Sequence, residues 1–168
     1  MPTDAEALAE ALVTLLAVRG EQSILAFDAA QNQVNKAAYR WDLWAAAYLI
    51  NGGCSDDGFD YFRGWLLAQG RRIWEEALAD PDSLAALFPD GADDVYESED
   101  MRAAAYRAYE EVTGAAETFL AAVQYLRDQE DEPLVTGDGP AGESFDFDDP
   151  AEMRARLPRL ATLFRDDE

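Results

Sequence analysis

Apolar residues recur every three to four positions over most of the chain, which is the period of an amphipathic α-helix. In the first such stretch four leucines share one stripe, which stops near Gly20: Leu8, Leu12, Leu15 and Leu16. Thr3 and Glu6 precede the stripe at the spacing of a capping box. The pattern therefore predicts a first helix that begins at Thr3.

A second helix is expected to begin at Ser23, with Ile24, Phe27 and Val34 on its apolar side. Its polar residues are expected to face solvent: Gln31, Asn32, Gln33, Asn35 and the only lysine, Lys36. The end of this helix stays open, because helical spacing continues through positions 41–49 up to two glycines at 52 and 53.

A further helix is predicted from Asp56 to Gln69. Ser55 can cap it, and Asp56 and Asp57 occupy its first turn, where the helix dipole favours anions. Aromatic and aliphatic residues cover a wide arc of this helix, so we expect it to be central and Trp65 to lie in the core.

Shorter helical patterns follow at 71–79 and 84–88, and longer ones at 99–113 and 119–127, read as two helices or as one bent at Gly114. Residues 128–150 are rich in acid, Gly and Pro and carry no periodic apolar face. The prediction is an all-α single-domain helical bundle over residues 1–127, with its motif core at 41–84. An acidic connector at 128–150 and a docked C-terminal helical segment at 151–168 complete it.

The net charge of the chain limits the classes of partner that it can bind. The 168 residues include 35 acids and 13 bases, a formal net charge of -22. Ten acids and no base lie within 73–101, and nine acids and no base within 128–150. A field of this sign repels phosphate, so we expect no direct nucleic-acid binding and no membrane binding. The longest nearly apolar run, 11–18, is far short of the roughly 20 residues of a membrane span.

The residue types present limit the catalytic and metal sites that the chain can form. Histidine is absent, which excludes Ser-His-Asp hydrolysis, Cys-His nucleophiles and His-ligated zinc. Cys54 is the single cysteine, so the chain can form no internal disulfide, and we expect a cytoplasmic location. It has no neighbouring base that would stabilise a thiolate, so we do not expect a reactive thiol. We predict no catalytic residue, no cofactor and no metal, and we lean against an enzyme.

The segment 41–84 contains three blocks: LWAAAYLINGG, SDDGFDYFRGWLLAQG and DPDSL. It resembles an uncharacterised bacterial family, the domain of unknown function number 4240, whose typical stretch reads LWxAAYxIxGG, SDDxFxYFRxWLxxQG and DPDSL. The resemblance implies a helical fold and brings no settled activity with it.

Asp56, Asp60 and Arg63 share one face of the predicted helix, and three interpretations of this face stay open. In the first, the acids cap the helix and Arg63 ties it to a neighbour. In the second, Arg63 binds a carboxylate or phosphate in a pocket. The candidate ligand-binding residues of that pocket are Trp41, Trp44, Tyr48, Trp65, Asp56, Asp57, Arg63 and Gln69. In the third, Asp56, Asp57 and Asp60 hold Mg²⁺ or Ca²⁺, although such sites usually gather carboxylates from two helices.

The sequence alone does not establish a function. The interpretation favoured by the charge is a non-catalytic acidic binding or regulatory module for a basic protein partner. The alternative is a small-molecule-binding pocket, or an unrecognised enzyme, built around Arg63 and the Asp56 and Asp57 carboxylates. An acidic surface that serves only solubility is the third possibility.

Overall fold

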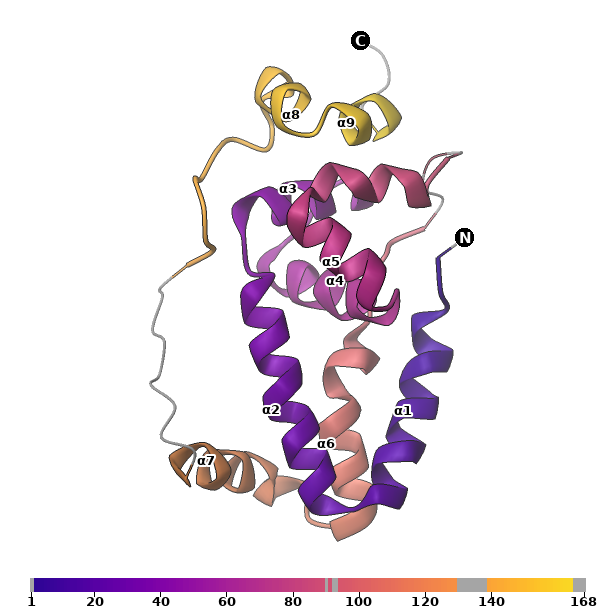
Figure 1. Ribbon diagram of the computed structural model, residues 1–168, viewed down its shortest axis with the longest axis vertical. Coiled ribbons are helices and arrows are strands. Elements are labelled where there is room, and N and C mark those ends of the chain that lie inside the picture. Colours follow the sequence, from indigo (N-terminus) through magenta and orange to yellow (C-terminus); the bar gives the residue numbers. More distant parts are fainter. Residues whose placement is uncertain (1, 90, 92–93, 130–138, 165–168) are drawn as a thin grey trace.

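The computed structural model describes residues 2–89, 91, 94–129 and 139–164, which are largely helical (Figure 1). Within these residues no strand forms, apart from one isolated bridge between Arg40 and Ala141. The α-helices are Ala5–Arg19 (α1), Glu21–Ala37 (α2), Trp41–Asn51 (α3), Asp56–Ala68 (α4), Arg71–Ala79 (α5), Glu99–Thr113 (α6), Phe119–Gln129 (α7), Pro150–Arg156 (α8) and Pro158–Phe164 (α9). Two 3₁₀ helices lie at Pro81–Leu87 (η1) and Ala116–Thr118 (η2). The prediction of an all-α fold is confirmed.

Helices α1, α2 and α6 run along the long axis of the molecule, and α7 crosses their far end (Figure 1). Small residues on α6, Ala104, Ala105 and Ala108, are buried between these helices. The core of this end is one apolar cluster: Val13, Leu16, Ile24, Leu25, Ala104, Ala105, Ala108, Tyr109, Phe119 and Val123. Alanine at the α6 crossings permits close approach of the helices, as ridge-into-groove packing requires.

A second, larger cluster lies where α3, α4, α5 and η1 meet the C-terminal helices α8 and α9 (Figure 1). Phe59, Phe62 and Trp65 of α4 are at most 4% exposed within it, as the wide apolar arc of this helix predicts. Helix α4 also crosses α6 closely at Gly64, where a Cβ atom would lie 2.4 Å from the backbone oxygen of Ser98. Helix α4 therefore joins the two ends of the molecule.

Helix boundaries follow the capping chemistry, with shifts from the prediction at the starts of α1 and α2. Helix α2 begins at Glu21 after Gly20, not at Ser23, whose hydroxyl donates to the backbone oxygen of Arg19. Asp4, not Thr3, caps α1 by accepting a hydrogen bond from Ala7 N, while Thr3 N donates to Gln69 Oε1. Ser55 caps α4 as predicted. Gly52 ends α3 in the left-handed conformation, at φ 67°. The boundary that the pattern left open lies at 38–40, where Arg40 is extended and separates α2 from α3.

The polar run of α2 differs from expectation. Gln31 and Asn35 are each only 3% exposed. Gln31 donates to the backbone oxygen of Met101 at 2.7 Å, and Asn35 Nδ2 donates to the backbone oxygen of Gln31 at 3.0 Å. These bonds satisfy the amide nitrogens of Gln31 and Asn35, so this face of α2 packs on α6 although its residues are polar.

The predicted connector, 128–150, falls partly on 130–138, which lie outside the described residues. Its described part runs beside α3 and leads into α8 (Figure 1). None of the helices in the described ranges combines the length and the apolarity that a bilayer crossing demands.

Candidate functional site

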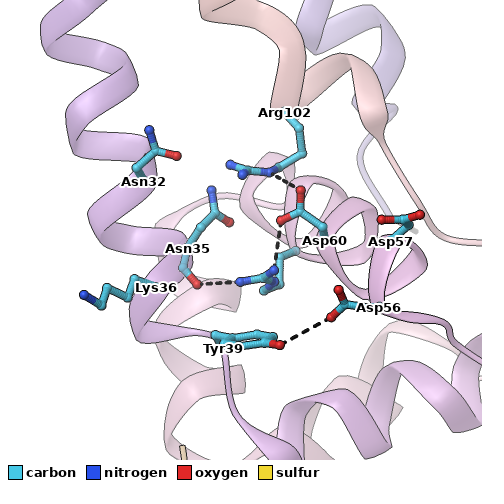
Figure 2. Close-up of a pocket in the computed structure, with 9 residues that line it drawn as sticks. Asn32, Asn35, Lys36, Tyr39, Asp56, Asp57, Asp60 and Arg102 are labelled. Atoms are coloured by element: carbon cyan, nitrogen blue, oxygen red, sulfur yellow. Dashed lines mark hydrogen bonds and ion pairs between the residues drawn. The ribbon is translucent and has the colours of Figure 1, made fainter. Parts of the chain in front are cut away.

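A polar cavity of about 410 Å³ opens between α2, α4 and α6. Its lining consists of charged side chains, amides and one tyrosine (Figure 2): Asn32, Asn35, Lys36, Tyr39, Asp56, Asp57, Asp60, Arg63 and Arg102. Helix α2 contributes the residues of its last turns, and α4 those of the polar face that the sequence predicted. Figure 2 shows polar side chains from α2, α4 and α6 converging on one space, which makes the cavity the candidate site.

Arg63 lies at the base of this cavity and is 9% exposed. Its Nη1 donates to the backbone oxygen of Asn35 at 3.0 Å, its Nε to that of Phe59 at 3.3 Å, and its Nη2 to Asp60 Oδ1 at 2.8 Å. The guanidinium also lies 4.9 Å from the ring centres of both Tyr39 and Phe59. Arg63 thus ties the end of α2 to α4, as the first of the three sequence interpretations proposed.

Burial lowers the pKa of Arg63, and the neighbouring Asp60 carboxylate opposes that shift. Asp60 is shared between two bases: its Oδ1 accepts from Arg63, and its Oδ2 accepts from Arg102 Nε at 3.0 Å. The Asp60 carboxylate therefore joins α4 to α6 and has a guanidinium on each oxygen. Metal coordination by Asp60 would first have to break these two ion pairs.

Asn35 carries the unusual feature of the cavity. Its Oδ1 has no hydrogen-bond partner within the described residues, although the side chain is almost fully buried. Figure 2 shows this amide projecting from α2 toward the space beside Arg102 and Asp60. A buried acceptor without a donor costs about 1 to 3 kcal/mol, so it marks a position where a donor from outside the protein would be stabilised.

Asp56 and Asp57 form the open side of the cavity and are exposed. The hydroxyl of Tyr39 donates to Asp56 Oδ1 at 3.3 Å. Burial, with the Asp56 carboxylate beside it, raises the pKa of Tyr39, so this phenol stays a donor at neutral pH. The exposed part of the lining thus carries the Asp56 and Asp57 carboxylates and the Lys36 ammonium, whereas the Arg63 guanidinium is buried.

The structure brings only part of the predicted pocket together. Asp56, Asp57 and Arg63 line the cavity, whereas the predicted aromatic wall does not. Trp41, Trp44 and Tyr48 instead contact Phe147 of the C-terminal segment, with ring centres 6.1, 6.3 and 5.5 Å away.

Trp65 and Gln69 point to other parts of the molecule. Trp65 packs against Phe62, Phe88 and Tyr96. Gln69 Nε2 donates to the backbone oxygens of Thr3 and Trp65. The geometry therefore separates the aromatic residues of the motif from its polar face.

Asn35 and Arg102 were not among the predicted site residues. Asn35 stands in a run that looks solvated in sequence, and Arg102 lies 39 positions beyond Arg63. The sequence around Arg102 at the start of α6 gives no signal of its own. Among the described residues there is also no group of three or more His, Cys, Asp or Glu side chains placed to hold a metal ion.

Acids of the two predicted windows serve local structure where they are described. Asp82 and Asp80 pair with Arg159, and Asp149 caps α8. Other acids of these windows form ion pairs with arginines close by: Glu75 with Arg71, Glu76 with Arg72, Asp100 with Arg107 and Glu143 with Arg156. Among the described acids of these windows, six thus pair with an arginine.

The family model of DUF4240, a protein family of unknown function, matches residues 2–111. The chain belongs to this family. The match contains every residue that lines the cavity, and it ends before α7 and the C-terminal segment. No curated protein and no solved structure matches the chain. The polar cavity of this chain therefore lies within the matched region, whereas α8 and α9 lie outside it.

Proposed function

We propose that this DUF4240 domain is a non-catalytic binding module that takes a cationic group of a basic protein partner into the polar cavity. The group is an ammonium or guanidinium that donates hydrogen bonds, as lysine and arginine side chains do. It enters past Asp56 and Asp57 and donates to Asn35. The partner's remaining basic residues interact with the acidic surface around the entrance.

One observation carries this proposal: Asn35 Oδ1 is a buried acceptor with no donor among the residues that the structure describes, in a cavity whose lining includes two exposed carboxylates. An acceptor in this position favours a ligand that donates. A donor that is also positively charged gains further from Asp56 and Asp57, and from a chain whose net charge is -22.

An anionic ligand finds less support at the same place. The Asp60 carboxylate already occupies the facing sides of Arg63 and Arg102. To bind Arg63, a phosphate or carboxylate would have to displace Asp60 and also pass the two acids at the entrance. The proposal that Arg63 serves as an anion receptor is therefore the weaker one.

The non-catalytic part of the proposal rests on the reactivity of the side chains. The chain contains no histidine. Burial, with Glu97 nearby, raises the pKa of the Cys54 thiol to about 12, so at neutral pH this thiol is protonated and a poor nucleophile. Arg63 and Asp60 form an ion pair with each other, so neither side chain is free to act as an acid or base without breaking that pair.

A second candidate follows from the size and charge pattern of the cavity. Its volume of about 410 Å³ suits a small polar molecule, and its lining combines three acids, Asp56, Asp57 and Asp60, with three bases, Lys36, Arg63 and Arg102. A zwitterion such as free arginine or lysine would match both signs. This is the small-molecule alternative, with Arg102 rather than Arg63 as the cationic partner.

Fluorescence anisotropy with a labelled lysine-rich peptide tests the proposal. The same peptide with acetylated lysines keeps its length and loses its charge. We expect the charged peptide to bind and the Asp56→Asn/Asp57→Asn variant to weaken binding about tenfold, or about 1.4 kcal/mol. Asn35→Leu should weaken it as well, because the buried acceptor is removed.

The matched control is Glu110→Gln/Glu111→Gln, which removes two exposed charges of α6 that do not line the cavity. If both double variants weaken binding equally, only net charge matters and the cavity has no special role. If free arginine displaces the labelled peptide at a concentration similar to that of the peptide, the small-molecule candidate is favoured instead.

A further inference from the structure

A short stretch of backbone connects the polar cavity to the C-terminal part of the chain. Tyr39 lines the cavity and lies in the break between α2 and α3. Ala141 N donates to the backbone oxygen of Tyr39 at 2.8 Å, and Trp41 N donates to the backbone oxygen of Ala141 at 3.0 Å. Trp41 is the first residue of α3, so its N–H has no partner within that helix. The two bonds therefore hold both peptide groups of Arg40, and with them the backbone from which the Tyr39 side chain projects.

The Tyr39 side chain carries this constraint into the cavity. Its hydroxyl donates to Asp56 Oδ1 at 3.3 Å (Figure 2), and its ring centre lies 4.9 Å from the Arg63 guanidinium. Asn35, which holds the buried acceptor, lies in the turn of α2 just before Tyr39, and its backbone oxygen accepts from Arg63. A shift of Tyr39 would therefore disturb the contacts of Asp56 and Arg63 together with the end of α2.

A second contact supports Tyr39 through aromatic rings. Phe147 contacts Trp44, with ring centres 6.3 Å apart, and the Trp44 ring lies 6.3 Å from that of Tyr39. Trp44 and Tyr39 also stack on Phe59, with ring centres 5.0 and 6.1 Å away. Residues 139–149 thus support Tyr39 at two points, one on the backbone and one through rings.

Residues 139–149 are held less firmly than the helices that follow them. Each is exposed or half-buried, whereas Met153, Leu157 and Leu160 farther along the chain are at most 2% exposed. Segments with few buried apolar contacts open locally at a lower free energy than the core does. Residues 139–149 can therefore detach from the α2–α3 break while α8 and α9 stay docked.

We infer that residues 139–149 form a strap that positions Tyr39 and thereby regulates how tightly the polar cavity holds its ligand. This inference rests on the function proposed above. While the strap is docked, Tyr39 keeps Arg63 and Asp56 in place, and the cavity is organised before the ligand arrives. Once the strap detaches, binding must also order these side chains, which lowers the affinity. The strap lies beyond residue 111, where the family match ends, so the regulation comes from outside the matched region.

Fluorescence anisotropy with the lysine-rich peptide tests the strap, with Ala141→Pro as the main variant. Proline has no N–H, so this change removes the bond to the Tyr39 oxygen. Ala141→Ser is the matched control, because it keeps the N–H at the same exposed position. We expect Ala141→Pro to weaken peptide binding about fivefold and Ala141→Ser to leave it unchanged.

Amide hydrogen exchange gives a second readout, which a purely structural role of the strap would not change. Coupling between two sites is reciprocal, so saturating peptide should slow exchange of the Ala141 N–H in the wild type by about the same factor of five. An unchanged exchange rate, or equal affinity of wild type and Ala141→Pro, overturns the inference and leaves the proposed function standing. A wild type that binds no peptide overturns the proposed function and the inference with it.

Phe147→Ala serves as a second variant, because it removes the aromatic contact and keeps both backbone bonds. We expect it to weaken peptide binding as well, by a smaller factor than Ala141→Pro. Circular dichroism and urea unfolding check that the rest of the protein stays folded in both variants. If both are unfolded, the strap is an inseparable part of the core and the inference is overturned.

Discussion

The DUF4240 motif contributes to two surfaces, of which one is covered by the rest of the chain and the other is open. Its aromatic residues on α3 are covered by the protein's own C-terminal segment, through Phe147. Its polar residues on α4 line a cavity that stays open and holds a buried acceptor without a donor. The aromatic surface is thus already satisfied within the chain, whereas the polar cavity is not. An external ligand has more to gain at the polar cavity.

The strongest test of this contrast lies in the aromatic interior behind the motif. Trp65 is 4% exposed and contacts Phe62, Phe88 and Tyr96. Trp65→Ala should lower the free energy of unfolding by about 3 to 5 kcal/mol, because it leaves a large cavity. Urea denaturation measures the loss, with Trp65→Phe as the control that keeps an aromatic ring and loses less. An unchanged midpoint for Trp65→Ala would contradict the assignment of Trp65 to the core.

Two glycines of α4 test how closely this helix packs on its neighbours. A Cβ on Gly64 would lie 2.4 Å from the backbone oxygen of Ser98, so Gly64→Ala must push α4 and α6 apart and should cost about 3 kcal/mol. A Cβ on Gly58 would lie 2.9 Å from Glu97 Oε1, which is the end of a movable side chain. Gly58→Ala should therefore change stability by less than about 1 kcal/mol, since alanine also favours the helix. Equal losses in thermal denaturation would argue against the close α4–α6 crossing.

Arg63 lies between the two surfaces, and its replacement separates structural from binding roles. Arg63→Lys keeps the charge but loses the fork that reaches Asn35, Phe59 and Asp60 together, so we expect a loss of about 2 kcal/mol. Arg102→Lys is the comparison, because the Arg102 side chain is 21% exposed and has one ion pair, with Asp60. Its loss should stay below about 1 kcal/mol. Were Arg63→Lys as stable as the wild type, the bonds of Arg63 would not be holding α2 to α4.

The smallest expected effect depends on pH. Asp28 accepts a hydrogen bond from Asn32, a cavity residue, and burial raises the pKa of Asp28 above its ordinary value of 3.8 in spite of Arg127 and Arg102. A raised pKa means that the ionised carboxylate disfavours the folded state above that pKa, and that this penalty disappears as pH falls toward 3.8. Asp28→Asn should therefore stabilise the protein slightly at neutral pH and lose this advantage in acid.

Urea unfolding at several pH values measures this difference, and exposed Glu110→Gln is the control. A variant that is less stable than the wild type at neutral pH would show that the carboxylate, not the amide, suits this position.

Local patterns predicted most of the helices because their causes are local. Ser55, Gly52 and the spacing of Phe59, Phe62 and Leu66 fix α4 without reference to the rest of the chain. The break between α2 and α3 escaped prediction, because extended backbone at Arg40 is supported by Ala141, a hundred residues away.

The sequence predicted only those residues of the candidate site that lie on α4. Asp56, Asp57 and Arg63 share a face of α4, so periodicity places them together. Asn35 and Arg102 join them only through the packing of α2 and α6 on α4. The burial of Asn35 could not be read from a polar run, because its neighbours Asn32 and Gln33 differ from it in exposure and not in residue type.

The central claim is that a cationic donor occupies the polar cavity beside Asn35. Titration of ¹⁵N-labelled protein with the lysine-rich peptide, followed by chemical shifts of side-chain amides and arginine Nε groups, tests it most directly. We predict saturable shifts at the Asn35 amide and at Arg102 Nε, absent with the acetylated peptide and in the Asp56→Asn/Asp57→Asn variant. Shifts confined to residues outside the cavity, or the same shifts with the acetylated peptide, would contradict the claim.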